Sequence, residues 1–368
     1  MRTVLVTGGA GFIGSCLVRM LLDPGQDKVI NLDKLTYAGS LDSLRSALDD
    51  PNHVFVRGDV GDRALVADLL EQHAPHAVFH AAAESHVDRS IDGPAAFVET
   101  NVLGTFQLLE AVRGYWASLS EPARSSFRFI HVSTDEVYGS LAPGQYANEN
   151  TAHAPNSPYA ASKAAADHFA RSYFQTYGLG VITTHCSNNF GPYQFPEKLL
   201  PLVVLNALEG EQLPLYGDGG NIRDWLFVED HCRALVAALE HGAPGEVYNI
   251  GANCERTNLE IVCMVCRIID KLCPRLAHRP CESLITFVGD RPGHDRRYAL
   301  DSGKARRDLN WQPRHDLSSA LRLTVEWYLN NSVWVDRVTS GINRRQRLGL
   351  ATATTQQDDP SRARQPLQ

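Results

Sequence analysis

The chain has 368 residues, of which 43% are hydrophobic and 21% are charged, and its formal net charge is -7 at pH 7. This composition is ordinary for a globular protein with a large core, and the length favours division into two domains. The negative charge argues against a nucleic-acid partner, which would require a basic face. No apolar run is long enough to span a membrane, and the chain begins with a strand pattern rather than a signal peptide. We therefore expect no membrane contact and a cytoplasmic location.

A glycine-rich turn follows the first predicted strand, residues 2–7, and leads into a helical pattern over residues 15–22. Glycines let the backbone approach a pyrophosphate, and the helix N-terminus supplies free N–H groups and the positive end of a dipole. The next predicted strand, residues 28–32, ends at Asp33, whose carboxylate can bind the ribose hydroxyls of an adenosine. A carboxylate there would repel a 2′-phosphate. The pattern therefore predicts NAD rather than NADP, although the neighbouring Lys34 weakens this preference.

Strands and helices continue to alternate to about residue 190. Strands are expected at residues 53–56, 77–80, 127–132 and 181–184, and helices at 64–73, 97–112 and 159–177. This order predicts an α/β protein with a Rossmann-type, doubly wound parallel sheet. Apolar side chains cover more than half the circumference of the helix at 97–112, which exceeds the stripe that a surface helix needs. That helix is expected either to be deeply buried or to face a second subunit.

Thr134, Asp135 and Glu136 follow the predicted strand 127–132, at the sheet edge where ligands bind in open α/β folds. Burial and a neighbouring like charge both raise the pKa of a carboxyl group, so keeping two adjacent carboxyl groups ionised at this position costs free energy. A raised carboxyl pKa is also what a general acid needs near neutral pH.

Tyr159 and Lys163 are four residues apart in a predicted helix, so their side chains share one face. A free tyrosine has a pKa of about 10 and is a poor base at neutral pH. The ammonium of Lys163 and the positive charge of a bound nicotinamide would both stabilise the phenolate. This pair suits the removal of an alcohol proton during hydride transfer, and Thr134 can hydrogen-bond the same alcohol.

A simple dehydrogenase needs nothing beyond these groups, so Asp135 and Glu136 indicate a second step. Oxidation of a sugar alcohol to a ketone makes the neighbouring C–H acidic. One carboxylate can remove that proton while the other protonates a hydroxyl one carbon further on, which expels water. The reduced cofactor then returns its hydride, so the cycle is redox-neutral.

The regular alternation stops after Pro192, where proline, glycine and charged residues increase. We predict an NAD-binding domain at 1–190, to which about 225–252 returns, and a smaller C-terminal substrate-binding lobe at 191–224 and 253–341. Residues 342–368 are polar and are predicted to be a disordered tail. The second lobe contains cations expected to hold a diphosphate, for each of which a solvated loop is the alternative: Lys198, Arg223, Arg291, Arg296 and Arg297.

Eight cysteines are scattered along the chain and are expected to be reduced thiols in a cytosolic protein. The spacing of Cys263 and Cys266 suggests zinc, but both lie in an apolar helical pattern at 259–272. Cysteine at such positions usually behaves as a small buried hydrophobe. No metal site is therefore predicted.

Taken together, these motifs resemble the extended short-chain dehydrogenase/reductase family, also described as the NAD-dependent epimerase/dehydratase family, and within it the nucleotide-sugar 4,6-dehydratases. The resemblance is carried by residues 7–14, 32–39, 80–90, 133–139, 159–163, 186–202, 215–231 and 290–298. The trio Thr134, Asp135 and Glu136 is the specific part, because related sugar epimerases and decarboxylases lack the Asp–Glu pair.

The resemblance implies a homodimeric lyase that converts dTDP-glucose to its 4-keto-6-deoxy product and water. It makes Tyr159 the base for the 4-hydroxyl, with Lys163 tuning it and Thr134 assisting. Asp135 becomes the acid for the departing 6-hydroxyl, and Glu136 the base at carbon 5. The sequence leaves open a UDP-sugar 4,6-dehydratase, a nucleotide-sugar 4-epimerase or decarboxylase, and a non-catalytic NAD-binding scaffold or sensor.

The resemblance also assigns ligand contacts along the chain. NAD contacts fall to Gly8, Gly11, Phe12, Ile13, Gly14, Asp33, Lys34, Thr36, Asp59, Val60, Ala81, Ala83, Thr100, Tyr159, Lys163 and Asn189. Substrate contacts fall to Ser85, His86, Asn188, Glu197, Lys198, Leu199, Arg223, Asn258, Arg291 and His294.

Overall fold

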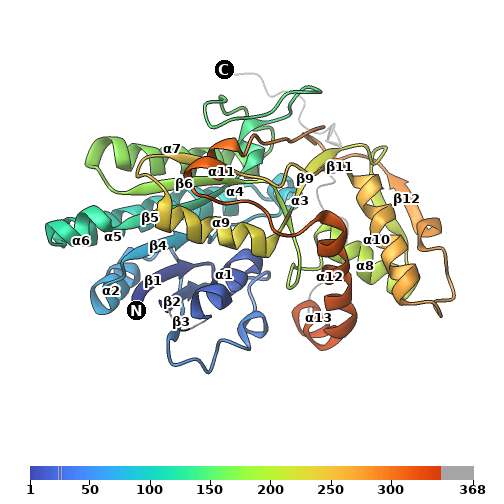
Figure 1. Ribbon diagram of the computed structural model, residues 1–368, viewed down its shortest axis with the longest axis horizontal. Helices are drawn as coiled ribbons and strands as arrows, with labels where there is room; N and C mark the ends of the chain where they lie inside the picture. Colours follow the sequence, from blue (N-terminus) through green and yellow to red (C-terminus); the bar gives the residue numbers. More distant parts are fainter. Residues whose placement is uncertain (24, 26, 341–368) are drawn as a thin grey trace, which may run out of the picture.

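A seven-stranded parallel sheet forms the centre of the protein (Figure 1). The computed structural model describes residues 1–340 except 24 and 26. The sheet contains β1 (Arg2–Thr7), β2 (Asp27–Asp33), β3 (His53–Arg57), β4 (Ala77–His80), β5 (Arg128–Thr134), β6 (Val181–Cys186) and β10 (Val247–Ile250). The strand order is β10-β6-β5-β4-β1-β2-β3. All strands are parallel, but the chain adds β2 and β3 on one side of β1 and the later strands on the other, so the order of addition reverses between β1 and β4. The predicted Rossmann-type doubly wound fold is confirmed, and ligands bind at such a reversal in folds of this kind.

Helices cover both faces of this sheet. They include α1 (Phe12–Leu22), α2 (Arg63–His73), α3 (Val87–Asp92), α5 (Thr105–Ser118), α6 (Glu121–Ser126), α7 (Pro158–Tyr177), α9 (Val228–His241) and α11 (Gly303–Asp308). Helices α1 and α9 share one hydrophobic cluster with Val4 and Val6, whereas α2, α5 and α7 share another with Leu5. Successive residues of β1 therefore enter opposite cores, which is why its sequence is a continuous apolar run.

The turn between β1 and α1 depends on two glycines. Gly8 has φ of +74°, and a Cβ there would lie 2.6 Å from the Cα of Ala82. A Cβ on Gly14 would lie 2.0 Å from the carbonyl oxygen of Gly8. Any larger side chain would push the helix away from the strand, so these glycines bring the first turn of α1 against the end of β1.

The helix predicted at 97–112 is confirmed, but it is not a regular α-helix throughout. A short α4 (Ala95–Phe97) passes into a π-helix, η2 (Val98–Gly104), before α5 begins. The wider turn places Asn101 so that its side chain accepts a hydrogen bond from the N–H of Glu84 and donates to the Glu84 carbonyl and to Ser162. These bonds tie the helix to the loop after β4. Val98 and Leu103 on this segment remain 49% and 53% exposed.

A smaller lobe lies at one end of the sheet, on the right in Figure 1. It contains two small sheets, ordered β11-β9-β7 and β12-β8. Its elements are β7 (Asn188–Phe190), α8 (Leu199–Glu209), β8 (Leu213–Tyr216), β9 (Ile222–Phe227), β11 (Glu255–Thr257), α10 (Asn258–Leu272), β12 (Ile285–Val288), α12 (Leu317–Asn330) and α13 (Ser332–Thr339). They enclose a hydrophobic core of their own. Within the segment predicted to return at about 225–252, β10 joins the large sheet beside β6, and β9 crosses the boundary predicted at residue 224. The domain boundaries themselves stay a prediction.

Three further expectations concern the periphery. The tail predicted at 342–368 lies outside the described residues. Across the described part of the chain, no helix has both the length and the apolar character needed to cross a membrane. All eight cysteines are free, and Cys266 and Cys281 are buried in the core of the smaller lobe. Within residues 1–340, except 24 and 26, these thiols form no group of three with atoms close enough to hold one metal ion.

Candidate active site

A cavity of about 300 Å³ opens where the strands β1, β4, β5 and β6 end. Its size falls within the range typical of small-molecule sites. Every residue that the sequence assigned to NAD lines it: Gly8, Gly11, Phe12, Ile13, Gly14, Asp33, Lys34, Thr36, Asp59, Val60, Ala81, Ala83, Thr100, Tyr159, Lys163 and Asn189. The glycine turn, three strand ends and the start of α7 therefore contribute to one continuous surface.

Asp33 is buried at the end of β2 and is held by the glycine turn. One carboxylate oxygen accepts the N–H of Ala10 and the other accepts the N–H of Leu35, both at 2.8 Å. Burial raises the pKa of Asp33, and these backbone donors partly offset that rise. The neighbouring Lys34 forms an ion pair with Asp59 at 2.6 Å, so its ammonium is already neutralised by a carboxylate.

The strand β5 delivers Thr134 to the cavity, and a single 3₁₀ turn, η3 (Asp135–Tyr138), follows. The Thr134 hydroxyl accepts the N–H of Glu136 and donates to Asp135, each at 3.3 Å. Gly139 ends the turn with φ of +70°, and a Cβ there would lie 2.2 Å from the carbonyl oxygen of Ala154. The hydroxyl thus fixes both acids at the rim of the sheet, and the glycine lets the chain turn away at once.

The two carboxyl groups lie in different electrostatic surroundings. Burial raises the pKa of Asp135 well above its usual range, and the charge of Glu136 raises it further. Burial also raises the pKa of Glu136 above its usual value, but the cations Arg291, Arg223 and Lys198 partly offset that rise. Asp135 is therefore the group that keeps its proton, and Glu136 is the one that loses it first.

Tyr159 and Lys163 enter the cavity from the first turns of α7. The hydroxyl of Ser157 caps this helix by accepting the N–H of Ala160 at 3.0 Å. Lys163 donates from Nζ to the Val132 carbonyl at 2.8 Å, which fixes the helix against β5. Burial raises the pKa of Tyr159 well above its usual value, the charge of Glu136 raises it further, and a hydrogen bond with Thr134 lowers it. The phenol is therefore neutral in this state.

The residues predicted to bind substrate divide into two groups. Ser85, Asn188, Glu197 and Lys198 line the cavity. His86, Leu199, Arg223, Asn258, Arg291 and His294 do not. Their role in substrate binding stays a prediction.

Three residues of this second group interact with residues that line the cavity. Arg223 and Arg291 lower the pKa of Glu136 through their charge, and the Nε2 of His86 lies 3.8 Å from Glu197. The other three belong to the smaller lobe and its loops: Leu199 is the first residue of α8, Asn258 is the first residue of α10, and His294 bonds to Asp290 at 2.6 Å.

Two further arginines expected at a diphosphate are engaged elsewhere. Arg296 pairs with Asp218 at 2.6 Å on the exposed surface. Arg297 pairs with Glu255 at 2.7 Å and donates to the carbonyl of Ala142. These contacts hold the segment 295–298 in place, so the structure gives no support to a diphosphate role for either residue.

Sequence reasoning missed several residues of the site. Glu84, Ser133, Cys186, Ser187, Gln194 and Phe195 also line the cavity. Asp88 does not line it, but its carboxylate accepts from Arg291 at 2.6 Å and from the Tyr216 hydroxyl at 2.7 Å. Ser133 and Cys186 lie at predicted strand ends, so the sequence could have placed them in the site. Gln194 and Phe195 come from an irregular loop without periodicity, so no sequence pattern predicts their position.

Several buried polar atoms around the cavity have no hydrogen-bond partner in the described part of the chain. They include Oδ2 of Asp135, Oδ1 of Asn188, Oε1 of Gln194 and Nε of Arg291. An unsatisfied buried polar group costs about 1–3 kcal/mol, so such atoms are rarely left unpaired without a reason. Their mixture of acceptors and one donor suits a ligand with several hydroxyl groups and an anionic part.

The fold and this site define an extended short-chain dehydrogenase/reductase with two adjacent carboxyl groups at the end of β5. The family model described as GDP-mannose 4,6 dehydratase matches residues 5–324. A dTDP-glucose 4,6-dehydratase of Xanthomonas campestris pv. campestris (strain B100) is 55% identical over 349 residues, which cover 95% of this chain and 99% of the relative.

Solved structures of the same enzyme are also similar to this chain. The dTDP-glucose 4,6-dehydratase from Bacillus anthracis str. Ames, in complex with NAD, has a TM-score of 0.81 and 44% identity, covering 92% of this chain and 100% of that one. The dTDP-glucose 4,6-dehydratase from Streptomyces venezuelae, with NAD and TYD bound, has a TM-score of 0.82 and 46% identity, covering 91% of this chain and 99% of that one. The chain belongs to the dTDP-glucose 4,6-dehydratase family.

Proposed function

We propose that this protein is an NAD-dependent hydro-lyase that converts dTDP-glucose to dTDP-4-keto-6-deoxyglucose and water. The observation that carries the proposal is the pair of adjacent carboxyl groups beside Tyr159: burial raises the pKa of both, but cations offset part of the rise strongly only at Glu136, so Asp135 keeps its proton to the higher pH. The relatives at more than half identity bear the name of this activity. A cytoplasmic location stays a prediction from the sequence.

The residues of the cavity fit NAD. Gly8 and Gly14 allow the backbone of the turn to lie close to a pyrophosphate, and the first turn of α1 has no acidic side chain that would compete for it. Asp33 can accept ribose hydroxyls, and the ammonium of Lys34 beside it is paired with Asp59, which makes it less available to a 2′-phosphate. The chemistry that NAD supplies when bound is a hydride acceptor for carbon 4 of the sugar and, once reduced, a hydride donor for carbon 6.

Oxidation at carbon 4 requires removal of the hydroxyl proton by Tyr159. Burial favours the neutral phenol, so the phenolate must be stabilised by positive charge and by hydrogen bonding. Lys163 supplies a fixed ammonium one helical turn away, oriented by the carbonyl of Val132. Thr134 lies against both the phenol and Asp135, so its hydroxyl can bind the same sugar oxygen.

Elimination then requires one base and one acid on neighbouring carbons. Glu136 takes the proton from carbon 5, because the cations near it favour its ionised form. Asp135 gives its proton to the oxygen on carbon 6, which leaves as water. A base works above its pKa and an acid works below its own. The two groups are therefore active together only in the interval between the lower pKa of Glu136 and the higher pKa of Asp135.

The competing functions fit the site less well. The reactions of a 4-epimerase or a decarboxylase do not require an acid and a base at the end of β5. A non-catalytic NAD-binding scaffold does not require a buried Tyr159–Lys163 pair on a capped helix. A UDP-sugar 4,6-dehydratase would use the same acids. Only the recognition of the nucleoside separates it from the proposed function, because thymidine and uridine differ in the 5-methyl group of the base and in the 2′-hydroxyl of the ribose.

We also propose that the protein is a homodimer. Val98 and Leu103 on η2 are exposed, and Phe169 on the adjacent α7 is 37% exposed with its ring 5.9 Å from that of Phe106. An apolar surface formed by two neighbouring helices is typical of a subunit interface.

The substrate is tested by supplying purified protein and NAD with dTDP-glucose or UDP-glucose at equal concentration. We expect dTDP-glucose to yield a 4-keto product that absorbs in alkali, with kcat/KM at least about tenfold higher than for UDP-glucose. No 4-keto product from either sugar would refute the dehydratase function. Faster turnover of UDP-glucose would instead assign the enzyme to the uridine nucleotide.

The division of roles is tested with Asp135→Asn and Glu136→Gln, each serving as the control for the other. Each variant should lose about 10²- to 10⁴-fold in product formation, the usual contribution of a general acid or base. Reduced nicotinamide should still form in both variants, because Tyr159 is unchanged. Solvent deuterium should enter carbon 5 with Asp135→Asn but not with Glu136→Gln. Retained exchange in Glu136→Gln would remove Glu136 from the role of base.

The dimer is tested by light scattering on the eluted protein, which should give twice the chain mass of 40.6 kDa. Leu103→Lys should shift the protein toward the single-chain mass, because it places a charge in the proposed interface. Leu323→Lys is the matched control, since Leu323 is 45% exposed on the distant α12. A wild-type protein that elutes with the mass of one chain would contradict the proposal.

A further inference from the structure

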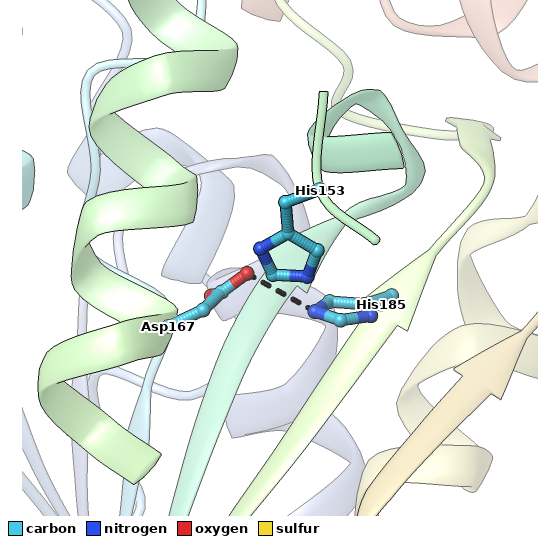
Figure 2. A group of neighbouring side chains, drawn as sticks. All are labelled: His153, Asp167 and His185. Atoms are coloured by element: carbon cyan, nitrogen blue, oxygen red, sulfur yellow. Dashed lines mark hydrogen bonds and ion pairs between the residues drawn. The ribbon is translucent and has the colours of Figure 1, made fainter. Parts of the chain in front are cut away.

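A cluster of potential metal ligands lies behind the active site, outside the cavity. His153 comes from the segment before α7, Asp167 from α7, and His185 from β6, and Figure 2 shows their side chains converging. One donor atom from each lies within 4.8 Å of the other two. No other group of three such residues meets this condition among residues 1–340 with 24 and 26 set aside.

The hydrogen bonds of His185 fix where its proton lies. Asn249 donates from Nδ2 to the Ala147 carbonyl at 2.9 Å, so its Oδ1 faces Tyr138. The single hydroxyl proton of Tyr138 is donated to that oxygen at 2.9 Å. Tyr138 must therefore accept from Nδ1 of His185, 2.6 Å away, and Nδ1 carries a proton.

The other nitrogen of His185 consequently faces a carboxylate. Its Nε2 lies 3.0 Å from Oδ2 of Asp167. A bare nitrogen lone pair at that distance from a carboxylate oxygen would be repelled, so a cation must lie between them. That cation is either a proton shared between the two groups or a metal ion.

The surroundings resemble the outer shell of a metal site. Metal-binding histidines usually donate their second ring N–H to a neighbouring group, as His185 does to Tyr138, and ligating carboxylates are themselves hydrogen-bonded. Asp167 accepts from His131 at 3.0 Å and from the Ser133 hydroxyl at 2.9 Å. Two of the three candidate ligands are therefore already oriented by buried partners.

His153 supplies the third donor. Its ring packs edge-on against Tyr138 and His185, with centroid separations of 5.5 Å, and its Nδ1 is buried without a hydrogen-bond partner. Ligand atoms around a tetrahedral zinc ion lie about 3.4 Å apart, given bonds of about 2.1 Å. A small inward rotation of this half-buried ring therefore completes a set of two imidazoles and one carboxylate. A fourth position is open to water or to His168, whose ring centroid lies 5.2 Å from that of His153.

We infer that His153, Asp167 and His185 form a binding site for one divalent transition-metal ion of the zinc type. Imidazole and carboxylate ligands suit such an ion. Bound there, it ties the segment before α7 to both α7 and β6, and so stabilises the entry to the helix that carries Tyr159. The site is structural, because none of its three ligands lines the cavity.

The test uses the full-length protein after treatment with a chelator and dialysis, titrated with Zn²⁺ by calorimetry. We expect one ion per chain, together with a higher thermal unfolding midpoint in the presence of Zn²⁺. His153→Phe keeps the ring packing but removes the donor. It should weaken Zn²⁺ binding by more than about 100-fold, since even the loss of an outer-shell partner typically costs 10- to 100-fold. If this variant does not fold, His153→Leu, which also lacks a donor atom, serves the same purpose.

Cys263→Ser is the matched control, because the half-buried Cys263 lies in the region where thiols are the alternative zinc ligands. It should leave Zn²⁺ binding unchanged, and Co²⁺ bound to the wild-type protein should show no thiolate charge-transfer band. Three results would overturn the inference: no saturable Zn²⁺ binding, equal binding by His153→Phe, or loss of binding with Cys263→Ser. The first of these would assign the cation between His185 and Asp167 to a proton.

Discussion

The burial of two adjacent carboxyl groups at the end of β5 is the constraint on which the rest of the site depends. Ionising two neighbouring carboxyl groups in a desolvated site costs free energy through burial and through the repulsion of like charges. Their surroundings therefore determine which group keeps its proton. Asp135 is enclosed and has an unpartnered oxygen, whereas Glu136 lies within the field of Arg291, Arg223 and Lys198. The asymmetry between the neighbours turns two similar side chains into an acid and a base.

The fold supplies these neighbours from elements far apart in the sequence. Asp88, which follows β4, holds Arg291 of the smaller lobe, and Lys198 opens α8 while it donates to the carbonyl of Ser85. Lys163 fixes α7 to β5 through Val132. The smaller lobe thus acts on the chemistry of the sheet edge chiefly through its positive charges. A change that displaced either lobe by a small distance would alter the protonation of Glu136 before it altered the fold.

Much of this arrangement could be predicted from residues that are close together in the chain. The glycine turn, Asp33 and the spacing of Tyr159 and Lys163 are local patterns with a direct physical meaning, and parallel strands bring their ends to one edge. The order of the elements therefore predicted an NAD site, the resemblance to the family supplied its individual residues, and all of those residues line the cavity.

The other features of the site depend on contacts between residues that are far apart in the chain or that lie in irregular loops, and no local sequence pattern predicts these contacts. The π-helix at Val98–Gly104 accompanies the bonds of Asn101 to Glu84, which is 17 residues earlier, and it interrupts the helix predicted there. Gln194 and Phe195 come from an irregular loop, and the pairing of Asp88 with Arg291 spans 203 residues. The convergence of His153, Asp167 and His185 likewise has no motif spacing, which is why the sequence predicted no metal site.

The central claim is that Asp135 carries a proton near neutral pH while Glu136 is ionised. Infrared difference spectroscopy measures this directly, because a protonated carboxyl group has a carbonyl stretch that an ionised carboxylate lacks. The account predicts that the wild-type protein with NAD shows this band at about pH 7, that Asp135→Asn removes it, and that Glu136→Gln retains it. A wild-type spectrum without the protonated band, or a band that disappears only in Glu136→Gln, would contradict the account.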